Sequence, residues 1–256
     1  MKKLLFLFTL LLSFQSVIAD CSAFGIQFYP MQEKINRNAM FIIQGYAMNI
    51  KTIKTFKNRK VYLKSESGEL VELKLQEILY SQMNLAQAIF MPSKTLRSNT
   101  KYFLKYENQT DKETKDMQSR FYGDKKPLYW ITSTEEYGKT FSTPVSATYK
   151  TSRVEYYGCG PEANAIFDVK NDPSKKTWYR TELLDVSTNT TSVYYIQSYN
   201  NKISVGHDMC SGAFSFNRKG MYKVRFTPIN SDGKAARATN WITFKSPFAG
   251  NKLNGF

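Results

Sequence analysis

The stretch SVGHDMCSGAF, residues 204–214, holds the residues best suited to chemistry, because it contains the only histidine of the chain and one of its three cysteines. His207 and Cys210 could form a nucleophilic dyad, which needs a thiolate, a base and a third group that orients the base. Together with Met209 they could also offer the soft ligands that copper prefers. The third interpretation is that Cys210 is one half of a disulfide and that His207 makes an ordinary hydrogen bond.

The residue types and their spacing favour the disulfide. Side chains three apart on a strand point to opposite faces, so His207 and Cys210 would not meet. Blue-copper sites use two histidines, and this chain has one. We expect Cys159, in YYGCGPEA, to pair with Cys210, because nearby thiols of an exported protein become oxidised. The bond would close a loop of about 50 residues, for which chain entropy gives roughly 4 kcal/mol of stabilisation. A dyad of Cys159 and His207 remains the catalytic alternative.

Other signatures of catalysis are absent from the sequence. A single histidine excludes an HExxH zinc site, and neither a GxSxG elbow nor a GxxxxGK[ST] phosphate loop occurs. The adjacent acids Glu135 and Glu136 do not by themselves provide the two carboxylates held across a cleft that a glycosidase needs. The sequence therefore predicts no catalytic residue, no metal site and no cofactor.

The first residues have the pattern of a secretory signal peptide. Lys2 and Lys3 precede an apolar run at residues 4–14, and the VIA sequence suits cleavage after Ala19. The apolar run is too short to cross a bilayer as a helix. We therefore expect an exported bacterial protein without a transmembrane segment, in the periplasm, at the cell surface or outside the cell. A lipid anchor on Cys21 is the alternative, although Asp20 fits poorly just before a lipidated cysteine.

Alternation of apolar and polar residues predicts an all-β chain built from two modules. Two segments place apolar residues at every second position: Tyr102, Leu104 and Tyr106 in the first, and Tyr222, Val224 and Phe226 in the second. Each is followed by a Trp-Ile-Thr sequence, at Trp130 and Trp241. Period-two alternation marks half-buried strands, and the repeated hairpin indicates two copies of one module. We predict β-sandwiches at residues 22–133 and 134–248, with the two tryptophans at equivalent places, and a flexible tail at 249–256.

The first module resembles a bacterial immunoglobulin-like (Ig-like) domain. The resemblance rests on an early proline, an apolar strand and a late P…L…T-Y pattern: Pro30, Phe41–Ile43, Pro92, Leu96, Thr100 and Tyr102. The sequence NRKGMYKVRFTPINSDGK, near the end of the second module, is similar to the closing hairpin of Ig-like and fibronectin type III sandwiches. The resemblance implies two tandem Ig-like sandwiches, a fold that serves adhesins, envelope proteins and enzyme accessory modules alike.

The chain carries a formal net charge of +15, and part of the excess is concentrated in one segment. Residues 34–64 contain no acid, and their densest basic part comprises Lys51, Lys54, Lys57, Arg59 and Lys60. A positive field of this kind attracts anionic polymers and surfaces. We predict that these five residues bind an anionic polysaccharide, lipopolysaccharide or an acidic protein surface. Nucleic acid is not expected, because an exported protein seldom meets it. The alternative is a solvated basic face.

These features predict a non-enzymatic exported binding or structural protein of the bacterial cell envelope or exterior. The alternative function is an accessory or catalytic component that acts on envelope polysaccharide, with carboxylates in a cleft between the modules. A close cluster of carboxyl groups with raised pKa in such a cleft would favour the enzyme.

Overall fold

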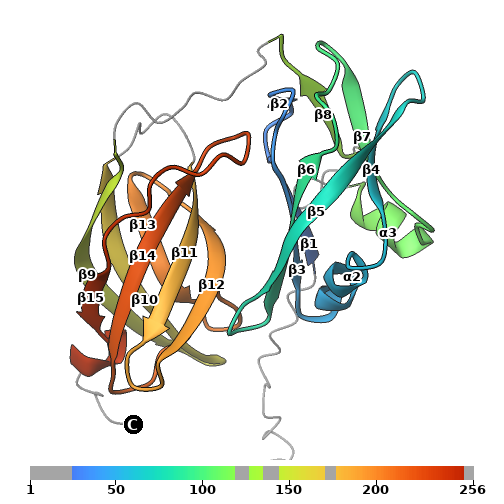
Figure 1. Ribbon diagram of the computed structural model, residues 1–256. Coiled ribbons are helices and arrows are strands. Elements are labelled where there is room, and N and C mark those ends of the chain that lie inside the picture. The colour runs from blue at the N-terminus through green and yellow to red at the C-terminus, as the bar shows by residue number, and fades with distance from the viewer. Residues whose placement is uncertain (1–24, 119–126, 135–143, 171–176, 251–256) are drawn as a thin grey trace, which may run out of the picture.

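The computed structural model describes residues 25–118, 127–134, 144–170 and 177–250, and it shows an all-β chain (Figure 1). The predicted fold class is therefore confirmed. The predicted signal peptide, Cys21, the pair Glu135–Glu136 and most of the predicted tail lie outside the described residues. Ala249, the first residue of that tail, belongs to a short 3₁₀-helix, η2 (Pro247–Gly250). The module boundary at residues 133 and 134 remains a prediction. Below, the N-terminal half means strands β1–β8, and the C-terminal half means strands β9–β15.

The N-terminal half is an eight-stranded sheet in the order β1-β3-β6-β5-β4-β7-β8-β2. Its strands are β1 (Gly25–Tyr29), β2 (Lys34–Ile35), β3 (Phe41–Tyr46), β4 (Val61–Ser65), β5 (Leu70–Tyr80), β6 (Leu85–Pro92), β7 (Lys101–Tyr106) and β8 (Tyr129–Thr132). The long strand β5 pairs first with β4 and then with β6, and its register shifts between Leu75 and Glu77. A bulge bends its strand, so β5 helps the sheet to curve around one core. That core includes Phe41, Leu63, Phe90, Tyr102 and Trp130.

Short helices accompany this sheet: η1 (Ala47–Asn49), α2 (Ile50–Thr55) and α3 (Asp111–Asp116). α3 begins with a capping box, in which the Thr110 side chain accepts from the Glu113 N–H and the Glu113 carboxylate accepts from the Thr110 N–H. α2 buries Ile53 in the core. It lies so close to β3 that a Cβ added at Gly45 would come within 2.7 Å of Ile53 Cγ1.

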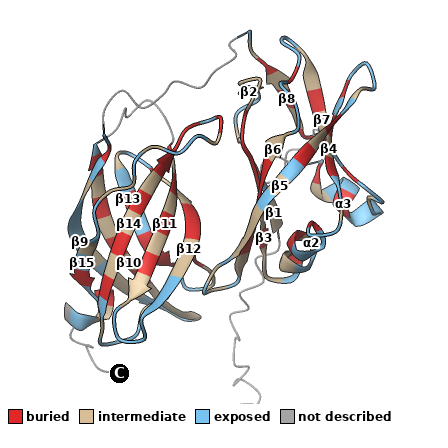
Figure 2. Cartoon of the chain, in the orientation of Figure 1, coloured by how far each residue is buried: buried red, intermediate tan, exposed pale blue. Residues whose placement is uncertain are grey.

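The C-terminal half is a sandwich of two sheets, in the orders β13-β10-β9 and β12-β11-β14-β15. Its strands are β9 (Ser146–Tyr157), β10 (Gly160–Lys170), β11 (Trp178–Asp185), β12 (Thr190–Gln197), β13 (Lys202–His207), β14 (Met221–Ile229) and β15 (Ile242–Lys245). Buried and more exposed residues alternate along β10, β11 and β14 (Figure 2). The inward residues of the two sheets form one core, which includes Phe167, Tyr179, Val205, Phe226 and Phe244.

The repeated strands β7 and β14 bury their alternating apolar residues, as predicted. Each of the two strands also carries a tyrosine whose hydroxyl makes the same kind of hydrogen bond, which the sequence did not reveal. The Tyr102 hydroxyl accepts from the Arg97 N–H at 3.0 Å, and the Tyr222 hydroxyl accepts from the Asn217 N–H at 2.8 Å. Each donor lies five residues before its tyrosine. A tyrosine bonded back to the backbone a few residues upstream also occurs in Ig-like sandwiches, where it is called a tyrosine corner.

The two tryptophans are not equivalent, so this part of the repeat prediction was wrong. Tyr102 lies opposite Trp130, whereas Tyr222 lies opposite Phe244. Trp130 is 1% exposed, whereas Trp241 precedes β15 and is 39% exposed. The second Trp-Ile-Thr sequence is therefore displaced by three positions relative to the first. An odd displacement moves every side chain of a strand to the opposite face.

The two halves contact each other through the outer face of β3 and β6. Ala88 and Phe90 of β6 face the N-terminal core. Ile89 points the other way and joins a third apolar cluster with Ile42 and with residues of the C-terminal half, including Tyr195. Because both faces of β6 are covered, five consecutive residues from Ala86 to Phe90 are buried.

Candidate functional site

His207 ends β13 and is 7% exposed. It pairs with Ala163 of β10, and its Nδ1 lies 2.8 Å from the Asp208 carbonyl oxygen. Among the described residues, no cluster of three or more His, Cys, Asp or Glu side chains could hold a metal ion. The hydrogen bond between His207 and the Asp208 carbonyl is the ordinary role that the sequence analysis considered for this histidine beside a catalytic dyad and a copper site.

The expected bond between Cys159 and Cys210 is not formed in the structure. Cys210 takes part in a disulfide, whereas the half-buried Cys159 lies outside it and has other interactions. The two residues nevertheless lie at the same end of two neighbouring antiparallel strands, Cys159 just before β10 and Cys210 shortly after β13, and Gly160 lies near the Met209 carbonyl. The sequence therefore indicated correctly that Cys210 is a disulfide cysteine, but Cys159, the partner it predicted, is not bonded to it in the structure.

The loop after β13 is held by one carboxylate. Asp208 Oδ1 accepts from the backbone N–H of Cys210 at 2.8 Å and from that of Ser211 at 2.6 Å. Gly212 then lies so close to His207 that an added Cβ would be 2.2 Å from the His207 Cβ. The Gly212 N–H donates to the Met83 carbonyl at 2.9 Å. Asp208 therefore shapes a turn that attaches the C-terminal half to the β5–β6 hairpin.

Three glutamines form a ladder across the surface of the N-terminal sheet that meets the C-terminal half. Gln27, Gln44 and Gln87 face one another in the register of β1, β3 and β6. Gln87 Nε2 donates to Gln44 Oε1 at 2.9 Å, and Gln44 Nε2 donates to Gln27 Oε1 at 3.0 Å. Gln87 also exchanges two hydrogen bonds with the Tyr195 backbone, one through each side-chain atom. The side-chain amides therefore provide hydrogen-bond partners for one another where the two halves meet.

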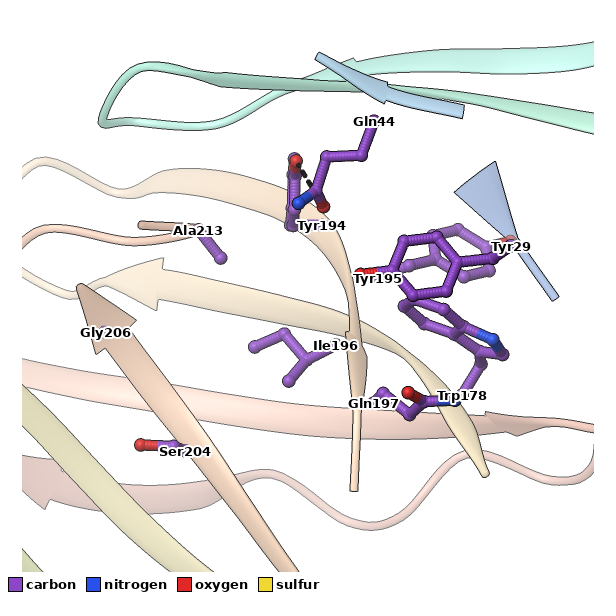
Figure 3. Close-up of a pocket in the computed structure, with 10 residues that line it drawn as sticks. All are labelled: Tyr29, Gln44, Trp178, Tyr194, Tyr195, Ile196, Gln197, Ser204, Gly206 and Ala213. Carbon is purple, nitrogen blue, oxygen red and sulfur yellow. Dashed lines mark hydrogen bonds between the residues drawn. The ribbon is translucent and has the colours of Figure 1, made fainter. Parts of the chain in front are cut away.

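A cavity of about 230 Å³ lies beside this ladder, lined by residues of both halves. At one end the rings of Tyr29 and Trp178 meet edge to face, 4.9 Å apart (Figure 3). On another wall, the Tyr194 hydroxyl donates to Gln44 Oε1 at 3.3 Å, as the dashed line in Figure 3 shows. Burial raises the pKa of Tyr29 to about 12 and also raises that of Tyr194. Both phenols are therefore neutral donors at physiological pH, and the cavity is lined by uncharged groups.

A second cavity, of about 570 Å³, shares Gln44 and Gly206 with the first. It is lined by Gly25 and Tyr46 from the N-terminal half and, from the other half, by His207, Asp208, Ser211 and Gly212. Sequence reasoning missed both cavities, because the residues that form them are far apart in the chain. The period-two placement of Gln44 within an otherwise apolar strand, FIIQGY, was the available signal.

The predicted basic residues do not form one uniform surface. Lys51 and Lys54 of α2, together with Lys57 and Lys60 just after it, are exposed, and we call these four residues the lysine surface. The first three are spaced by three positions, which places them on one side of the helical segment. Lys54 also lies over the Tyr80 ring, with 5.7 Å between its Nζ and the ring centroid.

Arg59 has a structural role instead. Its guanidinium binds both carboxylate oxygens of Glu113, at 2.6 and 2.8 Å, and its side chain is 15% exposed. It also donates to the carbonyls of Glu107 and Asn108. The bond from Arg59 lowers the pKa of Glu113. The fold thus brings an acid, Glu113, to a segment that has none in its own sequence. The Arg59 side chain is bound to α3 through this carboxylate and is not available to an external anion.

Within the described ranges, no helix is long and apolar enough to cross a membrane.

No protein-family model and no curated protein matches this chain. Among solved structures, it is similar to a pullulanase from Anoxybacillus sp. LM18-11, complexed with maltotriose, with 7% identity and a TM-score of 0.27 over 84% of this chain and 25% of that chain. It is also similar to a chain of a cytokine receptor complex, with 8% identity and a TM-score of 0.26 over 88% and 98% of the two chains. This chain spans a quarter of the pullulanase chain, and likenesses at these TM-scores carry no argument about function.

Proposed function

We propose that this protein is an exported, non-enzymatic binding protein of the bacterial cell envelope or exterior, and that the lysine surface docks it on an anionic polymer. The observation that carries the proposal is the exposure of Lys51, Lys54, Lys57 and Lys60 on one short segment. Of the acids that the fold brings nearby, Glu113 is paired with Arg59 and Asp116 with Lys112, and the Glu107 carboxylate accepts from the Lys60 backbone N–H at 3.2 Å. The four ammonium groups therefore keep their attraction for an external anion.

The proposal takes both halves as Ig-like modules. The equivalent hydrogen bonds of Tyr102 and Tyr222 support it, because both place a tyrosine corner on the strand that begins the closing hairpin. Modules of this kind bind through their surfaces and loops, and the fold alone selects no activity. The lysine surface lies on α2 and the residues just after it, and its four side chains lie outside the core.

The carboxyl groups also favour binding over catalysis. Four described carboxyl groups have a lowered pKa, mainly because a side chain donates a hydrogen bond to each: Glu69 (from Lys94), Glu113 (from Arg59), Glu155 (from Tyr157) and Asp185 (from Ser187). A general acid needs the opposite shift. Asp208, the acid that lines the cavity between the halves, is used as the cap of its own turn. The alternative of an enzyme acting on envelope polysaccharide therefore gains no support from these groups.

The test compares two variants with the same loss of charge. In the first, the four residues of the lysine surface are changed to Gln. In the control, four exposed basic residues of the C-terminal half are changed to Gln: Lys202, Arg218, Lys219 and Lys245. A lysine near an anionic surface contributes about 1 kcal/mol, so the first variant should bind roughly a hundredfold or more weakly to lipopolysaccharide vesicles at low salt. The control should bind within a few-fold of the unmodified protein.

Salt and a second ligand complete the experiment. Binding of the unmodified protein should fall as salt rises, because exposed charges are screened beyond about 8 Å at physiological ionic strength. An anionic polysaccharide replaces the vesicles in a parallel titration, which separates the two partner classes. Equal losses in both variants would mean that net charge alone attracts the polymer. Unchanged binding by the first variant would reject the lysine surface as the docking site.

A further inference from the structure

We propose that the cavity of about 230 Å³ between the two halves is a binding site for one ring of a neutral sugar. Residues of β12 and β13, the edge strands of the two sheets of the sandwich, line it together with Tyr29 and Gln44 of the N-terminal sheet. The proposal is independent of the lysine surface, none of whose residues lines this cavity.

The register of β12 turns backbone groups outward at the cavity. The Ser198 N–H donates to the Thr177 carbonyl at 3.0 Å, and successive residues of an antiparallel strand face their partner strand alternately. Gln197, which lines the cavity, therefore directs its N–H and carbonyl away from β11. Tyr195 does the same, but Gln87 already binds both of its outward groups. A peptide strand therefore cannot extend along this edge, whereas a small ligand can bind at Gln197.

The neighbouring strand β13 presents the same kind of groups. The Val169 N–H donates to the Asn201 carbonyl at 2.8 Å, so the odd-numbered residues of β13 bond to β10 and the even-numbered residues point outward. Ser204 and Gly206 are even-numbered, and both line the cavity. The Gly206 carbonyl accepts from the Phe214 N–H, whereas Ser204 presents its N–H and carbonyl. Backbone polar groups require hydrogen-bond partners, and a ligand with several hydroxyls serves donors and acceptors together.

The glutamine ladder adds a fixed donor and a fixed acceptor. Gln44 Oε1 accepts from Gln87 Nε2 and from the Tyr194 hydroxyl, and Gln44 Nε2 donates to Gln27. These bonds set the orientation of the Gln44 amide, and no described residue accepts its second Nε2 hydrogen. The Tyr194 oxygen can still accept a hydrogen bond after it has donated its own proton. Groups that are held in place before a ligand arrives lose less entropy when it binds.

The remaining lining selects a neutral ring over a charged ligand. The rings of Tyr29, Tyr195 and Trp178 gather at one end of the cavity and offer an apolar surface to the C–H face of a sugar (Figure 3). None of the ten lining residues has a charged side chain, so a charged ligand would lose hydration without gaining an ionic partner. Sites for drug-sized ligands measure about 300–1,000 Å³. A smaller cavity therefore suits a single sugar ring.

The experiment follows the tryptophan fluorescence of the full chain. Of its three tryptophans only Trp178 lines the cavity, and the Trp241→Phe variant keeps Trp178 and the buried Trp130. Acrylamide quenching of this variant is measured while glucose, galactose, mannose and N-acetylglucosamine are added separately. At least one sugar should lower the quenching about twofold, because a ligand in a cleft covers the groups that line it. Half of the effect should be reached at roughly millimolar sugar, because the ligand is small.

Two variants and two analogues test whether the effect is specific. The double variant Trp178→Phe/Trp241→Phe should show no sugar-dependent change in quenching. In calorimetry, Trp178→Phe should bind the sugar roughly fivefold more weakly, because the smaller ring offers less contact, whereas Trp241→Phe alone should match the unmodified protein. Cyclohexanol has one hydroxyl and glucuronate carries a charge. Each should shield Trp178 at least about tenfold less effectively, because a site that bonds to hydroxyls rejects analogues without them and an uncharged cavity disfavours an ion.

Salt and the lysine surface separate this proposal from the proposed function. Sugar binding should not weaken as salt rises, and changing the four residues of the lysine surface to Gln should leave it within about twofold, because the cavity has no charged lining. Loss of polymer binding with intact sugar binding would reject the proposed function alone. No shielding of Trp178 by any of the four sugars at up to about 100 mM, far above the millimolar range expected of a small ligand, would overturn the sugar site. Equal shielding by cyclohexanol would overturn it as well.

Discussion

The hairpins β7–β8 and β14–β15 close their two halves in the same way, although the repeated Trp-Ile-Thr sequence does not align them. The Thr132 hydroxyl donates to the Arg97 carbonyl, and the Ser246 hydroxyl donates to the Asn217 carbonyl. Arg97 and Asn217 are also the residues whose N–H groups bind the two corner tyrosines. Thr132 and Ser246 are therefore the equivalent residues.

This equivalence shows which features of a hairpin the fold requires. Trp130 lies two residues before Thr132, and Phe244 lies two residues before Ser246, so both rings point into their cores. Trp130 meets Phe41 edge to face at 5.0 Å, and Phe244 meets Phe167 in the same way at 5.4 Å. The shared requirements are an inward aromatic ring and a hydroxyl that binds the corner, while the identity of the ring differs.

The largest expected effect comes from removing these rings. Trp130→Ala and Phe244→Ala should each lower the free energy of unfolding by about 3–5 kcal/mol, because each empties a filled site in a core. Chemical denaturation followed by circular dichroism measures both. A loss below about 1 kcal/mol for Phe244→Ala would show that Phe244 is not the counterpart of Trp130.

The next effect concerns the tyrosine corners. Tyr102→Phe and Tyr222→Phe each remove the acceptor of one backbone N–H and keep the ring. Leaving such a donor without its partner costs about 1–3 kcal/mol. Because the two bonds are alike in geometry, the two variants should lose similar amounts of stability in the same denaturation assay. A difference larger than about 1.5 kcal/mol between them would mean that the two corners are not equivalent.

Much of the fold could be predicted from the sequence because strand alternation is a local signal. Tyr102, Leu104 and Tyr106 alternate with charged residues, and so their strand and its buried face were correct. The pairing of the next strand depends on a distant turn. Trp241 and Phe244 lie only three residues apart, and the pairing of β14 with β15, together with the Ser246 hydrogen bonds, sets the register that buries Phe244.

The candidate site was less predictable for the same reason. The exposed lysines near α2 are local, so four of the five predicted residues are exposed, whereas the acid that engages Arg59 comes from α3, 54 residues away. The glutamine ladder combines three strands, and the cavities combine both halves.

The smallest expected effect tests most directly whether the second Trp-Ile-Thr sequence is displaced by three residues relative to the first. Trp241 is 39% exposed and stacks over Arg225, with 4.7 Å between the guanidinium carbon and the ring centroid. A cation–π contact at such a site contributes about 0.5–1 kcal/mol, so Trp241→Ala should lower the free energy of unfolding by no more than that. The same variant should lose part of the tryptophan fluorescence that acrylamide quenches, because Trp130 is shielded in its core while the half-buried Trp178 keeps contributing. If Trp241→Ala instead destabilises the protein as strongly as Trp130→Ala, the two tryptophans occupy equivalent buried places and the register described for β15 is incorrect.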